Sequence, residues 1–122
     1  MSAATVVGLG ELMLRLKSPG HERLLQSPAL EATFGGAEAN VLISLAGFGV
    51  ATSFVSVLPA NAVGDAAIGE LRRHGVATDA VVRDGERVGI YYLEAGAAHR
   101  SSRVVYDRAG SAMATARPAQ FE

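Results

Sequence analysis

A glycine pair followed at once by an apolar helix pattern is the feature that most constrains how this chain can fold. Gly35 and Gly36 precede residues 41–49, where apolar side chains occupy nearly every position, and Asn40 lies between the two segments. Glycine lets a backbone turn and approach another group without a Cβ in the way. The unpaired amides of a helix's first turn point toward whatever occupies that turn. A helix that is apolar nearly all round is typical of a buried one. The pattern predicts a core helix whose first turn faces either a simple tight loop or the mouth of a ligand pocket.

Two short apolar runs frame that helix and predict an α/β fold. Residues 5–10 and 51–58 are short, rich in β-branched side chains and bounded by glycine or proline, as buried strands are. A second helix pattern follows the second run, with Asp65 in its opening turn and Arg72 and Arg73 in its last turn, where the helix dipole favours them. Gly75 is placed to end it. Alternating strands and helices with apolar strands indicate a parallel sheet with helices packed on it.

Other segments have a different period and predict a second, smaller sheet. Residues 13–17 and 30–34 alternate apolar and polar side chains, which is typical of strands with one wet face. Residues 79–83 and 87–94 are extended segments joined at Asp84-Gly85-Glu86, which predicts a hairpin, and residues 102–107 form another strand. We expect these strands to build a sheet that protrudes from the α/β body.

Composition excludes several classes of function. The 122 residues carry a net charge of −1 and no basic run, which gives no support to a nucleic-acid or membrane surface. No apolar run approaches the roughly 20 residues that span a bilayer. The absence of cysteine removes disulfides and thiolate sites and fits a cytoplasmic protein. Only two clear body strands are present, which predicts the first part of a larger domain because sheet edges would stay uncovered.

A few polar residues are candidates for a site. Glu11 follows the first strand, at the carboxyl end where open α/β sheets bind ligands, although a solvated turn residue is an equal alternative. The glycines around it do not form a dinucleotide motif, because Met13 stands where the third glycine is needed and no helix follows. Tyr106 and Arg108 are two apart on a strand and therefore point the same way. His74 is best explained as a charge at a helix end. The scattered histidines form no metal or nucleophile constellation.

Five ordered motifs resemble the ribokinase-like (PfkB) carbohydrate kinase family. They occupy residues 8–11, 35–40, 58–65, 88–94 and 103–112. The Gly-Gly-Ala-Glu-Ala-Asn segment is similar to the family's N-terminal signature. Its form, together with the last two motifs, is closer to the 2-keto-3-deoxygluconate kinase branch. The similarity extends over essentially the whole chain.

The resemblance implies a fold that agrees with the residue patterns. It implies a Rossmann-like ribokinase fold, present in part, with a small β-sheet lid that often serves as a homodimer interface. Residues 1–122 would be the N-terminal part of a PfkB-type sugar kinase domain. The lid strands would lie near residues 12–17, 29–34, 79–94 and 102–107.

The same resemblance implies which residues bind the substrate. Sugar hydroxyls would be held by backbone and amide groups of the first motif's turn, while aromatic and basic residues of the lid would contact the sugar. Arg108 would pair with the carboxylate of a sugar acid, as arginine's bidentate geometry suits. Without the family match, Tyr91 would be assigned to lid packing and Arg108 to the surface. The substrate-binding candidates are Glu11, Gly35, Gly36, Ala37, Glu38, Asn40, Tyr91, Tyr106 and Arg108.

The resemblance implies transfer of the ATP γ-phosphoryl to a sugar hydroxyl with Mg²⁺. The family's catalytic aspartate and nucleotide site belong to a later, glycine-rich part, and this sequence contains no such segment and no P-loop. We therefore expect no catalytic, ATP-binding or metal-binding residue in this chain. The resemblance therefore predicts a kinase that phosphorylates a sugar acid, 2-keto-3-deoxygluconate. This chain would supply the sugar-binding half of that kinase. The alternatives are a catalytically silent sugar-binding or dimerisation fragment and a fructokinase-like member of the family.

Overall fold

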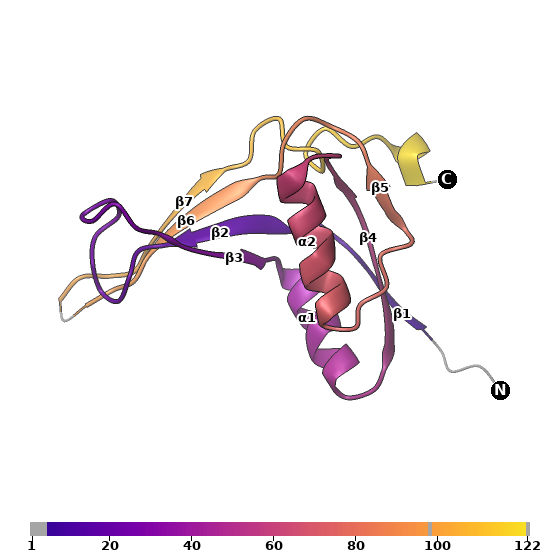
Figure 1. Cartoon of the computed structure of the whole chain (residues 1–122), viewed down its shortest axis with the longest axis horizontal. Coiled ribbons are helices and arrows are strands. Elements are labelled where there is room, and N and C mark those ends of the chain that lie inside the picture. The colour runs from indigo at the N-terminus through magenta and orange to yellow at the C-terminus, as the bar shows by residue number, and fades with distance from the viewer. Residues whose placement is uncertain (1–4, 98, 122) are drawn as a thin grey trace.

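The computed structural model describes residues 5–97 and 99–121 and contains an α/β body from which a second sheet protrudes (Figure 1). The elements in chain order are β1 (Thr5–Leu9), β2 (Met13–Lys17), β3 (Glu31–Gly35), α1 (Ala37–Gly47), β4 (Ala51–Leu58), α2 (Ala62–Arg73), β5 (Val81–Arg83), β6 (Ile90–Glu94), β7 (Arg103–Asp107) and the 3₁₀ helix η1 (Pro118–Phe121). The chain leaves the body after β1, returns at α1 and leaves again after β5. The predicted α/β class with a protruding lid is confirmed.

The body sheet is parallel, with strand order β1-β4-β5. Both helices lie on the same face of this sheet (Figure 1), as right-handed crossovers that progress in one direction require. Gly8 of β1 pairs with Phe54 of β4, and a Cβ at Gly8 would lie 2.9 Å from Cδ1 of Leu42 in α1. The missing side chain therefore lets α1 pack directly on the strand. The core under the two helices contains Leu12, Ala39, Leu42, Phe54, Leu58, Ala67, Ile68, Leu71, Val76 and Val88.

Two segments predicted to be buried have large exposed faces. On α1, Val41 is 57% exposed and Phe48 is 86% exposed, and only Ala39 and Leu42 are fully buried. On β1, Val7 and Leu9 are also exposed. In the described part of the chain, β1 pairs with β4 alone and the helices cover one face, so apolar composition overestimates burial here.

The C-terminal end of α2 is formed as the sequence predicts, and its N-terminal end is formed by a side-chain cap. Asn61 is the N-cap, and its side-chain oxygen accepts a hydrogen bond of 2.9 Å from the backbone N–H of Gly64. At the other end, Gly75 has a φ of +83°, the left-handed conformation that glycine adopts at a helix C-terminus. His74 caps the helix beside Glu70, whose pKa is held below its ordinary value, chiefly by the hydrogen bond from the Arg73 side chain.

The protruding sheet has the order β3-β2-β6-β7, with antiparallel outer pairs and a parallel central pair β2–β6. The predicted hairpin joining residues 79–83 to 87–94 is wrong. β5 continues the body sheet beside β4, and β6 enters the lid, so the Asp84-Gly85-Glu86 turn connects two sheets. Gly85 does have the positive φ (+83°) of a turn glycine, but the backbone N–H of Asp84 donates to Leu58 and keeps this turn on the body. Local turn chemistry does not specify which strand is the partner.

The segment after β7 returns to the body. Pro118 begins η1, a position that proline suits because its missing N–H has no helical partner there, and Gln120 donates a 2.7 Å hydrogen bond to the Asp84 carboxylate. Among the residues that the structure describes, no helix has the length and apolar character needed to cross a membrane.

Replacing Leu71 by Ala tests the core. Leu71 is fully buried between α2 and the sheet, so the substitution should lower the free energy of unfolding by about 2–5 kcal/mol. Phe48→Ala is the control, because its side chain is 86% exposed and its loss should change stability by less than about 0.5 kcal/mol. Urea unfolding followed by circular dichroism measures both. Equal losses for the two variants would contradict the described core.

Candidate functional site

A cavity of about 520 Å³ lies where the body meets the lid, and six of the nine predicted site residues line it. Its walls come from the β1–β2 connection, the start of α1, the end of β7 and the segment that follows β7. The lining residues are Gly10, Glu11, Met13, Gly36, Ala37, Glu38, Tyr106, Arg108, Met113 and Ala114.

Gly36 fixes the start of α1 against the β1–β2 connection. Its backbone is extended, with a φ of −178°, so a side chain would not be strained by the conformation itself. A Cβ there would lie 2.3 Å from the carbonyl oxygen of Glu11, which is impossible without backbone movement. Glycine is therefore required for space. No side chain caps α1, so the backbone amides of its first turn, at Ala37 and Glu38, are free to donate to a ligand in the cavity.

Gly10 also leaves space for a close contact, in this case with the side chain of Glu38. A Cβ at Gly10 would lie 1.9 Å from Oε1 of Glu38, so the Glu38 carboxylate passes directly over this glycine. Because Glu38 is exposed and lines the cavity, its carboxylate can accept hydrogen bonds from hydroxyl groups of a ligand.

Arg108 and Glu11 form an ion pair at the back of the cavity. Nη2 of Arg108 lies 2.9 Å from Oε1 of Glu11, and the Ser111 hydroxyl donates a 2.7 Å hydrogen bond to Oε2. The Arg108 side chain is 51% exposed, whereas the Glu11 side chain is 8% exposed. The cavity is thus presented with a guanidinium group whose partner carboxylate is buried behind it.

The two predicted tyrosines are neighbours across the lid sheet. Tyr91 of β6 pairs with Tyr106 of β7, and their ring centroids are 6.1 Å apart. Tyr106 is exposed and lines the cavity, as its position two residues from Arg108 predicts. Tyr91 does not line it: a Cβ at Gly35 would lie 2.6 Å from the Tyr91 hydroxyl, so this ring packs over the first glycine of the pair.

Gly35, Asn40 and Tyr91 are the predicted residues that do not line the cavity. Asn40 is exposed on α1, and its backbone N–H donates to Gly36 within the helix. Sequence reasoning missed Gly10, Met13, Met113 and Ala114 as lining residues, and Ser111 as the partner of Glu11. Ser111 had a signal, because its hydroxyl also accepts from the backbone N–H of Ala114 three residues later, a common capping spacing. No sequence pattern marked Met13 and Met113, because only the tertiary structure brings them to the cavity.

The described residues contain no group of three or more His, Cys, Asp or Glu side chains that could hold a metal ion. Independently of this, the start of α1, Glu38 and Arg108 offer hydrogen-bond donors and acceptors at the cavity.

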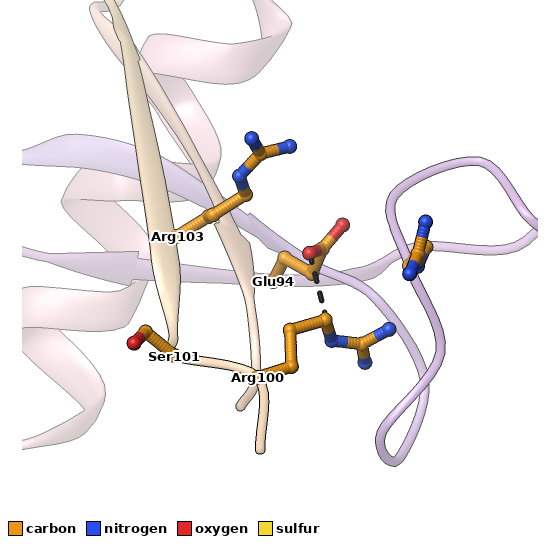
Figure 2. Close-up of a pocket in the computed structure, with 5 residues that line it drawn as sticks. Glu94, Arg100, Ser101 and Arg103 are labelled. Atoms are coloured by element: carbon orange, nitrogen blue, oxygen red, sulfur yellow. Dashed lines mark ion pairs between the residues drawn. The ribbon is translucent and has the colours of Figure 1, made fainter. Parts of the chain in front are cut away.

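A second hollow of about 290 Å³ lies at the far end of the lid (Figure 2). At its centre the buried Glu94 accepts a 2.8 Å hydrogen bond from the backbone N–H of Leu24, and Arg100 lies 3.9 Å from the same carboxylate. Arg100 also donates to the carbonyl of His21. These contacts fasten the β2–β3 loop to the tip of the lid, which is a structural role. Arg23, Ser101 and Arg103 complete the lining.

The fold and cavity together define a class of protein. A parallel α/β body with a protruding β-sheet lid, and a polar cavity at their junction, is the architecture of proteins with the ribokinase fold. Residues 3–122 match the model of the pfkB family of carbohydrate kinases, and the chain belongs to this family.

The chain is similar to several named proteins of this family. The chain is 41% identical over 115 residues to a 2-dehydro-3-deoxygalactonokinase of Haloferax volcanii, covering 94% of this chain and 36% of the relative. It superposes with a TM-score of 0.94 and 52% identity on the 2-dehydro-3-deoxygluconokinase structure from Thermotoga maritima, covering 97% of this chain and 36% of that one. For the fructokinase of Xylella fastidiosa with bound ATP, the TM-score is 0.80 and the identity 25%, over 97% and 37% of the two chains. The chain thus spans about a third of the length of these proteins.

Substituting Gly36 by Ala tests the junction between helix and pocket. The new Cβ collides with the Glu11 carbonyl, so the start of α1 must shift, and unfolding free energy should fall by about 1–3 kcal/mol. The matched control is Gly47→Ala at the other end of α1, where nothing lies within 4 Å of the added Cβ. That change should stabilise the protein by roughly 0.5–1 kcal/mol. Chemical denaturation compares the two, and equal effects would show that the glycine pair is not required for space.

Proposed function

We propose that this protein is the sugar-binding part of a kinase that phosphorylates a 2-keto-3-deoxy sugar acid, with 2-keto-3-deoxygluconate as the substrate. The observation that carries the proposal is Arg108, a half-exposed guanidinium group in the same cavity as the free N-terminus of α1. Arginine binds carboxylates in a bidentate, charge-assisted manner. The two relatives named for deoxy sugar acids, 41% and 52% identical to this chain, support an acidic sugar over a neutral one.

The rest of the cavity suits the remainder of such a substrate. The amides at the start of α1 would donate to sugar oxygens, and the exposed Glu38 carboxylate would accept from hydroxyl groups. Tyr106 would place its ring against the C–H face of the sugar and its hydroxyl at the rim. The sugar would then be held at both ends, with its acid group toward Arg108.

The described residues supply binding, and we assign no catalytic residue to them. ATP, with Mg²⁺, would supply the phosphoryl group when bound, but the described part of the chain has no acidic cluster for a metal and the sequence has no P-loop. We infer that nucleotide binding and base catalysis belong to a part of the kinase that these 122 residues do not provide. Their role in the reaction is to bind and orient the sugar.

Two other functions remain as alternatives with separate supports. A fructokinase-like specificity is supported by the structural likeness to the Xylella fastidiosa enzyme. A silent binding or dimerisation module is supported by the lid, whose edge strand β7 exposes Val104 and Val105. A homodimer through this sheet, acting in the cytoplasm, is part of our proposal.

Titration calorimetry with 2-keto-3-deoxygluconate and with fructose tests the proposal. The chain should bind the sugar acid, and Arg108→Ala should weaken that binding about 10- to 100-fold, since a hydrogen bond to a charged group contributes about 1.5–3 kcal/mol. Arg103→Ala is the matched control, because this arginine lies at the other end of β7 and outside the cavity. It should leave affinity unchanged.

The outcomes separate the alternatives. Equal losses of fructose and sugar-acid binding in Arg108→Ala would favour a fructokinase-like site. A parallel assay of ATP consumption should show no turnover. Turnover would contradict the assignment of catalysis elsewhere, and absence of binding to either sugar would remove the sugar-binding proposal for this chain.

A further inference from the structure

The carboxylate of Glu11 is nearly buried at the wall of the cavity, between Arg108 and Ser111. Its side chain is 8% exposed, and Oε1 has essentially no solvent-accessible surface. Nη2 of Arg108 lies 2.9 Å from that oxygen, but its N–H is not aligned for a hydrogen bond, so the contact is ionic. Oε2 is occupied by the Ser111 hydroxyl at 2.7 Å. Oε1 is therefore closed to a sugar hydroxyl unless Arg108 moves, and Oε2 already accepts a hydrogen bond from Ser111.

Two segments far from Glu11 in the sequence surround its carboxylate, one at Gly89 and one at residues 108–114. A Cβ at Gly89, just before β6, would lie 2.5 Å from Oε2 of Glu11 and 3.2 Å from Cβ of Arg108. Ser111 is itself fully buried, and it is fixed because its hydroxyl also accepts from the Ala114 amide at 3.2 Å. Gly89 thus leaves the space, and Ser111 holds the carboxylate in it.

The Glu11–Arg108 ion pair is not well explained by a contribution to folding stability alone. Removing a carboxylate from water is costly, and apolar replacements of buried ion pairs are often as stable. The pair does, however, fix the direction of a long and otherwise flexible side chain. A guanidinium group has donors on more than one edge, so Glu11 can hold Nη2 while another edge faces the cavity.

We propose that Glu11 is the positioning residue that orients Arg108, and that the Glu11–Arg108 pair sets the preference for acidic over neutral sugars. The inference rests on the proposed function, because it assigns Arg108 to the substrate carboxylate. Glu11 then acts on the substrate only through Arg108. Without its charge, Nη2 loses its anchor and the guanidinium group turns toward solvent.

Glu11→Gln tests this role, because it keeps the size and the acceptor for Ser111 but removes the charge. Calorimetry should show about a tenfold loss of affinity for 2-keto-3-deoxygluconate, since the cost of freeing the arginine is expected to be near the 1.4 kcal/mol that a factor of ten represents. Binding of a neutral ketose such as fructose should be unchanged. In the Arg108→Ala background the same substitution should have no further effect on either sugar, as expected of two residues that act as a unit.

Two companion variants keep the test decisive. Ser111→Ala leaves the charge but frees the carboxylate, and it should reduce acid binding in the same selective way but by less. Glu70→Gln is the matched control, because this half-buried glutamate pairs with Arg73 on α2 and does not line the cavity. It should change neither affinity. Thermal unfolding of each variant checks that the fold is retained.

The results that overturn the inference differ from those that overturn the proposed function. If Glu11→Gln weakens acidic and neutral sugars equally, tightens acid binding, or adds to the loss in Arg108→Ala, Glu11 is not a positioning residue although the sugar-binding function stands. If Glu11→Gln fails to fold, an unselective effect of Ser111→Ala leads to the same conclusion. If the unaltered chain binds no sugar, the proposed function fails and the inference fails with it.

Discussion

The close approach of the Gly36 backbone to the carbonyl of Glu11 is the contact on which the cavity depends. It joins the point where the chain leaves the body, after β1, to the point where it returns, at α1. With a Cβ at Gly36 the two backbones could not meet, and the first turn of α1 would lie farther from the β1–β2 connection. The free amides of α1, the carboxylate of Glu38 over Gly10 and the side chain of Glu11 are all placed by this junction.

The lid supplies the remaining walls of the cavity. The parallel pairing of β2 with β6 brings Gly89 beside Glu11, and the antiparallel pairing of β6 with β7 then places Tyr106 and Arg108 over the cavity. The body contributes fixed backbone donors and a buried negative charge, while the lid contributes an aromatic ring and a positive charge. Our proposal of a polar ligand with an acidic end rests on this division.

The sequence was sufficient for the fold class, and six of the nine residues predicted to bind substrate line one cavity. Periodicity predicted the strands and helices because burial on one or both faces leaves a regular pattern of apolar residues, and a helix-end residue such as Gly75 marks a boundary locally. Sequence patterns failed where an element packs against a partner that is distant in the sequence. The turn at Asp84-Gly85-Glu86 predicts a reversal but not the sheet each flank joins, and the apolar character of α1 does not tell which of its faces is covered.

The same distinction applies to the site residues. Tyr106 and Arg108 could be predicted to share a direction, since two residues apart on a strand they must. That Ser111 holds Glu11, and that Gly89 leaves room for it, depends on contacts between segments that only the tertiary structure brings together. The motifs at residues 8–11 and 103–112 indicated that both segments contribute to the site. They did not indicate that the two segments are in contact.

The strand order of the lid has a consequence for how the molecule assembles in time. Its two antiparallel pairs, β2–β3 and β6–β7, are each close in sequence and can form early. The central pair β2–β6, in contrast, joins strands that are separated in sequence by β3, α1, β4, α2 and β5. Closing so long a loop costs chain entropy before any contact compensates for it. The halves of the lid can therefore dock only after α1, β4, α2 and β5 have brought their ends together. We expect Arg108 to meet Glu11 in one of the last folding steps, so that the completed pocket reports on the folding of the whole chain.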